Sequence, residues 1–292
     1  MTNTTYTSAK HPRFRELMLT LRILSRNPSA VGGALILSLM LFMALSADLL
    51  APFDPIQLNL GARLKPPSWE YLLGTDELGR DILSRIMYGA RISLRIGVII
   101  IAIAGGLGSI IGATAGYIGG RVDNIIMRVM DVILSFPSLV LAMALAAALG
   151  PSLTNAIFAI AFVMIPKFAR MVRGEALAIR ERPFVAAAKV SGASHSWIIR
   201  KHVLPNCINS VIVLATLTMG DAILIAASLS FIGLGAQPPT PEWGAMISVG
   251  RKFLMDQYWY ATFPGVFILT TVIGFNILGD ALRDVLDPRI RR

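Results

Sequence analysis

Charge-free apolar stretches recur along the chain. Residues 27–47, 96–120 and 257–279 hold no Asp, Glu, Lys or Arg, and residues 203–241 hold only Asp221. A hydrocarbon layer about 30 Å thick is crossed by about 20 helical residues, each rising about 1.5 Å. Each stretch therefore predicts a membrane-spanning helix.

A further stretch, residues 132–166, lacks charge over 35 positions and is too long for one span. Gly150-Pro151-Ser152 lies inside it and predicts a break between two helices. We expect the first of these helices to begin near Asp123 and the second to continue to about Met171. The pattern thus predicts an all-α polytopic membrane protein with about six spans.

The first span follows a basic N-terminal tail, so a cleaved signal peptide is the alternative interpretation. Its apolar stretch is longer than the roughly 7–15-residue core of such peptides. It is also followed by Asp48 rather than by a small-residue cleavage site. We interpret it as a retained anchor.

Composition supports a membrane protein. Of the 292 residues, 55% are apolar and 15% are charged, and the mean hydropathy is +0.66. Soluble domains are about 45–50% apolar and about 25% charged, so an ordinary soluble enzyme and a disordered chain are both excluded. The net charge of +10 comes from residues clustered between apolar runs, which argues against a nucleic-acid partner. The single cysteine, Cys207, excludes an internal disulfide.

The distribution of Lys and Arg predicts that both termini are cytoplasmic. With the N-terminus inside, the inside segments hold 18 Lys and Arg and the outside segments hold 7, which fits the positive-inside rule. The outside segment 51–91 is basic for its side of the membrane. We interpret residues 76–95 as an amphipathic helix along the outer interface, with Asp81 and Arg85 as an i,i+4 pair.

Small residues recur at every fourth position of the second span. They are Ala104, Gly108, Gly112, Gly116 and Gly120. Such a stripe lets another helix approach to backbone distance. It predicts a packing face, either within the chain or against a partner.

The basic segment between the fourth and fifth spans, residues 182–206, predicts two short helices joined at a glycine. Pro183 suits a first helical turn, and the alanines that follow it favour helix. Gly192 permits the positive φ found at helix C-termini. Ser194 can cap the next helix, which we expect to end before Pro205. The alanines are small enough to fit closely into a groove of another protein.

This segment resembles the EAA motif of ABC-importer permeases, whose loop forms a coupling helix that docks on the ATPase subunit. The resemblance implies a coupling role for Ala186, Ala187, Ala188, Gly192, Ala193, Ser194, His202, Leu204 and Pro205. Two positions depart from the motif, because Ala186 replaces the usual Glu and His202 replaces the Ile of many members. The first departure removes the acid for a specific salt bridge but leaves the helix–glycine–helix geometry.

Three further segments narrow the resemblance. Residues 73–81 read LGTDELGRD, residues 229–244 read LSFIGLGAQPPTPEWG, and residues 278–288 read LGDALRDVLDP. Together with the loop, they are similar to the second permease subunit (C-subunit type) of bacterial dipeptide and oligopeptide importers. The similarity runs from Asn27 almost to the end of the chain.

The resemblance implies a type I ABC-importer transmembrane domain in the bacterial cytoplasmic (inner) membrane. We expect a cytoplasmic tail at 1–28, an anchor with its external segment at 29–90, a permease core at 91–283 containing the coupling loop 173–206, and a second tail at 284–292. The implied partners are a homologous second permease subunit, two ATPase subunits that bind ATP-Mg, and an extracytoplasmic solute-binding protein.

Four residues are candidates for the translocation path or the outer mouth. Asp221 is an acid inside a span, where charge is costly and often functional. It could attract the amino terminus of a peptide, or it could make a structural hydrogen bond. Gln237, Glu242 and Trp243 lie in a proline-rich segment that cannot be regular helix, either bordering the outer mouth or merely connecting two spans.

Sequence signatures of catalysis are absent. No lysine follows a glycine, so the chain has no phosphate-binding P-loop, and it has no Gly-x-Ser-x-Gly nucleophile motif. His11, His195 and His202 are too few and too scattered for a metal site. We therefore expect no catalytic residue, metal or cofactor in this chain. Asp131 is expected to pair with Arg128, three residues earlier, in a structural role.

These observations predict a non-enzymatic permease subunit of an ATP-driven importer of di- and oligopeptides. The same machinery carrying glutathione or nickel chelates is an alternative. A proton-coupled secondary transporter working through Asp221 is a rival from another class. Such transporters usually show two similar halves and several intramembrane ionisable groups, and the sequence displays neither.

Overall fold

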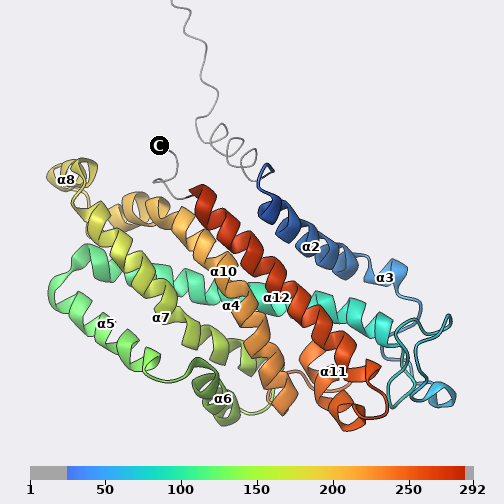
Figure 1. Ribbon diagram of the computed structural model, residues 1–292. Helices are drawn as coiled ribbons and strands as arrows, with labels where there is room; N and C mark the ends of the chain where they lie inside the picture. Colours follow the sequence, from blue (N-terminus) through green and yellow to red (C-terminus); the bar gives the residue numbers. More distant parts are fainter. Residues whose placement is uncertain (1–24, 287–292) are drawn as a thin grey trace, which may run out of the picture.

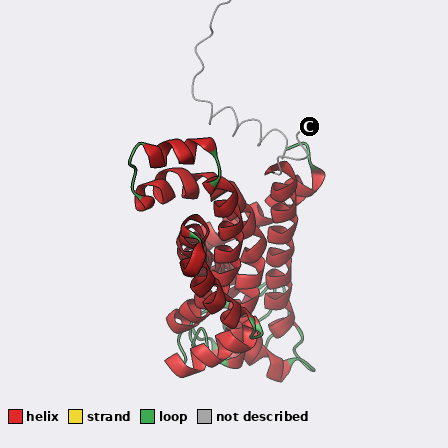
Figure 2. Ribbon diagram, turned by 90° about the vertical axis from the view of Figure 1, so that its left-hand side faces the viewer, coloured by secondary structure: helices red, strands yellow, loops and turns green. Residues whose placement is uncertain are grey.

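The computed structural model describes residues 25–286, which form a bundle of long helices with short helices at both ends (Figure 1). Within this part of the chain, Figure 2 shows helix and loop but no strand. The N-terminal tail through residue 24, with His11, and residues 287–292 lie outside the described residues.

Within the described residues, five helical runs are long and apolar enough to cross a membrane. They are α2 (Pro28–Leu45), α4 (Ile82–Ile118), α7 (Leu153–Arg180), the run from α9 (His195–Ile198) through a π-helical turn (Ile199–Val203) into α10 (Leu204–Ile232), and α12 (Trp259–Leu286). A bent pair, α5 (Gly120–Leu134) and α6 (Ser138–Leu149), passes the same test together and raises the number to six. The predicted all-α membrane architecture is confirmed.

Short elements lie at the two ends of the bundle. We call the end that carries α8 (Pro183–Val190) the loop end and the opposite end the distal end. The distal end carries residues 51–81 and the segment that follows α10 (Figure 1). The short elements there are α3 (Ala47–Leu50), α11 (Trp243–Gly250) and 3₁₀ turns at Leu60–Ala62 and Arg251–Phe253.

The crossing of α4 and α7 is the centre of the bundle. A Cβ added to Gly108 would lie 2.7 Å from the carbonyl oxygen of Ile165, and one added to Gly116 would lie 2.6 Å from that of Arg173. Gly112 faces the backbone of Ala169 even more closely. The predicted small-residue stripe is therefore a packing face within the chain. It ends at Gly116, because Gly120 begins α5 and a Cβ there would touch nothing.

The remaining spans surround this crossing. α10 lies across α4, and α12 packs between α10 and α2. Glycines again set the approach of helices, since a Cβ on Gly33 of α2 would lie 3.1 Å from the carbonyl oxygen of Gly274 in α12. Asn27 begins α2 by accepting a hydrogen bond from the Ser29 N–H at 3.0 Å.

Two breaks divide the long apolar stretch after α5. The predicted break is confirmed, because α6 ends at Leu149, Gly150 has a φ of +91°, and α7 begins at Leu153. A second break was not predicted from the sequence. α5 and α6 meet at 90°, where Pro137 cannot donate the backbone hydrogen bond that would continue the helix.

The expected amphipathic helix along the outer interface over residues 76–95 is wrong. Residues 76–81 are not helical, and residues 82–95 are the largely buried start of a single 37-residue helix, α4, rather than a separate interfacial helix. α4 begins only at Ile82, and Asp81 caps it by accepting the Ser84 N–H at 2.7 Å. Residues 76–81 instead form a tight loop. The Asp76 Oδ1 accepts the backbone N–H groups of Leu78 and Arg80, each at 2.9 Å. Because these bonds turn the chain back on itself, residues 76–81 do not continue the helix.

Asp76 also holds two buried arginines at the distal end. The Asp76 Oδ2 lies 2.6 Å from the Arg80 Nε and 3.6 Å from the Arg85 Nε, and all three side chains are nearly inaccessible. Arg85 donates further to the carbonyl oxygen of Pro55 at 2.8 Å. The expected Asp81–Arg85 pair is therefore wrong, because the Asp81 carboxylate accepts its hydrogen bonds from Ser84 at the start of the helix.

We predict that Gly112→Ala destabilises the protein and that Gly106→Ala does not. The new methyl group at position 112 must push the backbone of Ala169 away, and overpacking of this kind costs about 1–3 kcal/mol. Gly106 lies on the same helix with nothing within 4 Å of an added Cβ. Thermal unfolding of the two variants in detergent measures the difference, and equal melting temperatures would contradict this account of the crossing.

We predict that Asp76→Ala lowers stability by about 3–5 kcal/mol, because it leaves buried arginines without their acid. Glu70→Ala is the matched control. Glu70 is exposed and lies 3.9 Å from Lys65, so its removal costs at most about 1 kcal/mol. Chemical denaturation of both variants checks this, and a Glu70 variant as unstable as the Asp76 variant would rule out the specific role of the buried network.

Candidate functional site

The segment at the loop end has the helix–glycine–helix geometry that the sequence predicts. α8 begins with Pro183 in its first turn, and Gly192 follows the helix with a φ of +79°. The N–H of Ala193 then reaches back to the carbonyl oxygen of Ala188 at 3.0 Å, as in a Schellman-type helix end. Ser194 caps α9 by accepting the Trp197 N–H at 3.4 Å.

One buried side chain anchors α8 to the bundle. Val185 is fully buried in a cluster with Ala113 and Tyr117 of α4 and with Val172 and Ala176 of α7. The loop thus rests on the ends of the two helices that form the central crossing. A push on α8 acts directly on them.

The outward side of α8 is apolar and accessible. Ala186 and Ala187 are exposed, Ala188 is half-buried, and Val190 is 90% exposed. Phe184, next to the anchor, is also exposed. An exposed apolar helix face of this kind is typical of a surface that binds another protein.

His202 joins the two parts of the loop. Its ring lies 5.6 Å from that of Phe184 and 5.1 Å from that of Trp197, between ring centres. Leu204 is half-buried beside it, and Pro205 is exposed. His202 therefore packs within the loop, and no sequence pattern predicts these two aromatic contacts.

The expectation that the second short helix ends before Pro205 is wrong. Residues 199–203 form a π-helical turn, and the chain runs from α9 into α10 without interruption. Pro205 lies in the first turn of α10, where a missing backbone N–H is tolerated. The loop end is thus continuous with a membrane span.

Charged side chains of α7 form ion pairs with both neighbouring helices. The Lys167 Nζ lies 3.2 Å from the Asp221 Oδ2 of α10. On the other side, Arg170 and Arg173 lie 2.6 Å and 2.5 Å from carboxylate oxygens of Asp131 and Asp123 in α5. Such pairing between helices is the usual way in which charges are accommodated in spans.

These ion pairs contradict one predicted pair and give Asp221 a partner that was not predicted. The expected Arg128–Asp131 pair is wrong, because Asp131 binds Arg170 across the helix interface. Asp221 is exposed, as a residue of a path would be, and it has Lys167 as a partner. Neither Lys167 nor Arg170 could be found from local spacing, since their partners are 54 and 39 positions away along the chain.

The other three candidates lie at the distal end, far along the bundle from the loop helices. Gln237 is exposed, and its side-chain amide donates to the carbonyl oxygens of Gly233 and Gly235. Trp243 is fully buried and donates to the carbonyl oxygen of Ile86 at 3.1 Å. Glu242 is buried and caps α11 by accepting the Ala245 N–H at 2.9 Å.

Glu242 and Trp243 are buried, unlike residues that line an accessible outer mouth. Both side chains lie inside the protein, where their polar atoms already have partners. Burial raises the pKa of the Glu242 carboxyl, although hydrogen bonds from the backbone of Gly244 and Ala245 and from Ser230 and Ser93 oppose this. Glu242 therefore fixes the start of α11.

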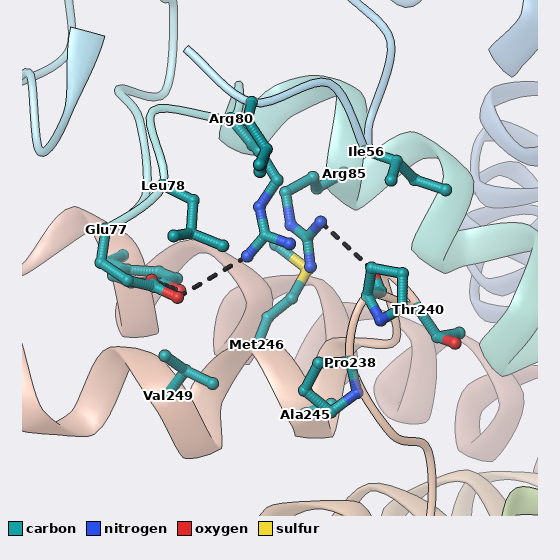
Figure 3. Close-up of a pocket in the computed structure, with 13 residues that line it drawn as sticks. Ile56, Glu77, Leu78, Arg80, Arg85, Pro238, Thr240, Ala245, Met246 and Val249 are labelled. Atoms are coloured by element: carbon teal, nitrogen blue, oxygen red, sulfur yellow. Dashed lines mark hydrogen bonds and ion pairs between the residues drawn. The ribbon is translucent and has the colours of Figure 1, made fainter. Parts of the chain in front are cut away.

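A small pocket opens beside the buried arginines (Figure 3). Its volume is about 270 Å³, and its walls come from residues 56–58, the 77–85 region, residues 238–249 and Tyr260. Figure 3 shows the guanidinium groups of Arg80 and Arg85 side by side, with Glu77 on one side and Thr240 on the other. The pocket lies between the distal loops and α12. A hydrogen bond that the Tyr260 hydroxyl donates to Glu77 connects these two parts.

We predict a pH-dependent stability difference between the wild type and Glu242→Gln. Because the Glu242 pKa is raised in the folded protein, protonation of this carboxyl stabilises the fold, and it does so fully at pH values below the ordinary pKa of 4.5. This contribution is lost as the pH rises through the raised pKa. The wild type should therefore lose stability relative to Glu242→Gln by at most about 1.4 kcal/mol per pH unit in that window. Melting temperatures of both proteins from pH 4 to pH 9 test this, and a difference independent of pH would contradict it.

Comparison with known proteins identifies the family. Residues 108–292 match the family described as binding-protein-dependent transport system inner membrane component. Residues 17–67 match the N-terminal TM domain of oligopeptide transport permease C.

Curated relatives match over nearly the whole chain. The probable D,D-dipeptide transport system permease protein DdpC of Escherichia coli (strain K12) is 52% identical over 267 residues, covering 91% of this chain and 90% of the relative. The dipeptide transport system permease protein DppC of Alkalihalophilus pseudofirmus is 46% identical and covers 92% and 88%. The di/tripeptide transport system permease protein DppC of Pseudomonas aeruginosa is 44% identical and covers 91% and 90%.

Identity of this level over about nine tenths of both chains, together with the helical bundle and the exposed loop helices, fixes the family. This chain belongs to the binding-protein-dependent transport system inner membrane components, as a permease of the oligopeptide permease C type.

Proposed function

We propose that this chain is one of two permease subunits of an ATP-driven importer of short peptides, and that its loop end couples the chain to an ATPase. The observation that carries this proposal is the exposed face of α8, mounted through Val185 on the ends of α4 and α7. A partner that binds this face moves the central helix pair.

The proposed cargo is a dipeptide or a slightly longer peptide. The relatives that match over about nine tenths of their length are named for dipeptide, D,D-dipeptide and di/tripeptide transport. Their names support peptides over glutathione or nickel chelates as cargo.

The proposed complex contains a homologous second permease, two ATPase subunits and a solute-binding protein on the outer side. ATP and Mg²⁺ bind to the ATPase subunits. The loop end and both termini face the cytoplasm, in agreement with the excess of Lys and Arg on that side. The distal end then faces the solute-binding protein.

In this mechanism, closure of the ATPase subunits pushes α8 and α9. Because α9 continues through the π-helical turn into α10, and α8 rests on α4 and α7, the push reaches three spans together. These helices then rock as a unit between inward-facing and outward-facing states. Nucleotide biases the two states by binding one of them better.

We predict that Gly192→Val uncouples ATP hydrolysis from uptake. A β-branched residue strains the backbone at a φ of +79°, so the two loop helices lose their relative angle while the spans stay inserted. Uptake by the reconstituted four-subunit complex with its binding protein should fall at least roughly tenfold, because a misaligned lever transmits little of the nucleotide energy. Hydrolysis of ATP should continue without stimulation by the loaded binding protein.

Gly150→Val is the matched control. Gly150 also has a positive φ, and it also has nothing within 4 Å of an added Cβ, but it lies at the distal end. It should retain coupled uptake. Normal coupling in the Gly192 variant would overturn the proposal, as would wild-type uptake that continues without ATP and collapses with the proton gradient.

A further inference from the structure

Two exposed ion pairs lie along the membrane-spanning part of α7. Lys167 is fourteen positions after the start of α7, and Asp221 is eleven positions before the end of α10. At about 1.5 Å per residue, they lie roughly 21 Å and 17 Å from the distal ends of their helices. In a hydrocarbon layer about 30 Å thick, this places the Lys167–Asp221 pair near the centre.

The second pair continues the first towards the loop end. Arg170 lies three residues after Lys167 on α7 and binds Asp131 of α5. The four side chains are between 40% and 55% exposed. We call Asp131, Lys167, Arg170 and Asp221 the charged band. In contrast, Asp123 lies nearer the loop end than the charged band, and its side chain is only 9% exposed in its pair with Arg173.

Lipid is excluded as the neighbour of the charged band. Ionised side chains that face hydrocarbon cost several kcal/mol each, and in known proteins they face a protein interior or a water-filled cavity. Burial of two complete ion pairs in a dry subunit interface also carries a large desolvation penalty. Water is the environment in which half-exposed pairs of this kind are stable without further partners.

We propose that the charged band lines a water-filled path and contacts the charged ends of the cargo as it passes. The inference rests on the proposed peptide cargo, because a peptide carries an ammonium group at one end and a carboxylate at the other. Asp221 accepts hydrogen bonds from the ammonium group, and Lys167 donates to the carboxylate. These two bonds to the peptide replace the bond between Lys167 and Asp221, so little charge is left unpaired while the peptide passes.

The balance of charge in each pair sets the selectivity. With both partners present, the Lys167–Asp221 pair is neutral and favours neither acidic nor basic peptides. Removal of one partner leaves a net charge at mid-membrane depth, where interactions between charges are stronger than in water. The two single variants should therefore shift the preference in opposite directions.

The first experiment measures access to water. Cys207 is the only cysteine and is buried, so it gives little background with a charged methanethiosulfonate reagent. In the assembled complex, Lys167→Cys and Asp221→Cys should react at least roughly tenfold faster than Leu35→Cys, since thiolate formation needs water. Leu35 is the control for the lipid face, because it is 70% exposed on α2.

Two outcomes of this experiment overturn the proposal. Rates equal to that of Leu35→Cys would place the charged band against lipid or in a dry contact. Reaction only when the second permease is omitted would place it in the interface between the two permeases.

The second experiment measures selectivity with the solute-binding protein kept constant. Uptake of an acidic dipeptide is divided by uptake of a basic dipeptide. Lys167→Met should lower this ratio and Asp221→Asn should raise it, each by roughly fivefold or more, because one uncompensated charge remains. The double exchange Lys167→Asp with Asp221→Lys should restore the wild-type ratio.

Asp48→Asn is the matched control for this ratio. Asp48 pairs with Arg91 at 3.1 Å and is similarly exposed, but it lies in α3. Its ratio should equal that of the wild type. The inference would be overturned if Lys167→Met and Asp221→Asn left the uptake ratio unchanged or shifted it in the same direction. Failure of the wild type to import any peptide would instead overturn the proposed cargo and leave the labelling result standing.

Discussion

The close approach of α4 and α7 supports every other feature of the bundle. In a membrane, helices gain little from burying apolar surface, so their association depends on close van der Waals packing. Gly108, Gly112 and Gly116 allow this, because each places bare backbone against the backbone of α7. The other spans then pack on a rigid pair. The loop helices and the charged band are both attached to this pair, at different heights along it.

The attachment explains why such different parts can act together. Val185 fixes α8 to the ends of α4 and α7, and Lys167 and Arg170 stand on α7 itself. α10 carries Asp221 and is continuous with α9. In the proposed mechanism, a movement at the loop end therefore carries α7 and α10 together, and with them the Lys167–Asp221 pair.

The spans and the loop could be read from the sequence because their signals are local. Charge-free runs, the Gly150 break and the positive φ at Gly192 each follow from a few neighbouring residues. The bend before Pro137 was missed, since a proline within an apolar run also occurs inside intact spans such as α7.

The ion pairs could not be read in the same way. Asp81 and Arg85, like Arg128 and Asp131, have the spacing of partners on one helix. Arg85 instead lies beside Asp76 of the tight loop, and Asp131 binds Arg170 of another helix. Glu242 and Trp243 looked accessible because they follow several prolines. Their burial depends on α4, which is distant in sequence and contributes the Ile86 carbonyl to Trp243 and the Ser93 hydroxyl to Glu242.

The length of α4 has a mechanical consequence for the distal end. Its 37 residues extend about 55 Å, whereas a bilayer with its headgroups is about 40–45 Å thick. At a common inclination of about 20°, its first turns extend beyond the bilayer, where they are buried among the other elements of the distal end. No hinge separates these first turns from the membrane-spanning part of α4. A further 10° of inclination therefore moves the distal end of α4 sideways by roughly 9 Å, calculated from a helix rise of about 1.5 Å per residue. In the proposed mechanism, the distal elements that contact these first turns therefore move with the membrane core.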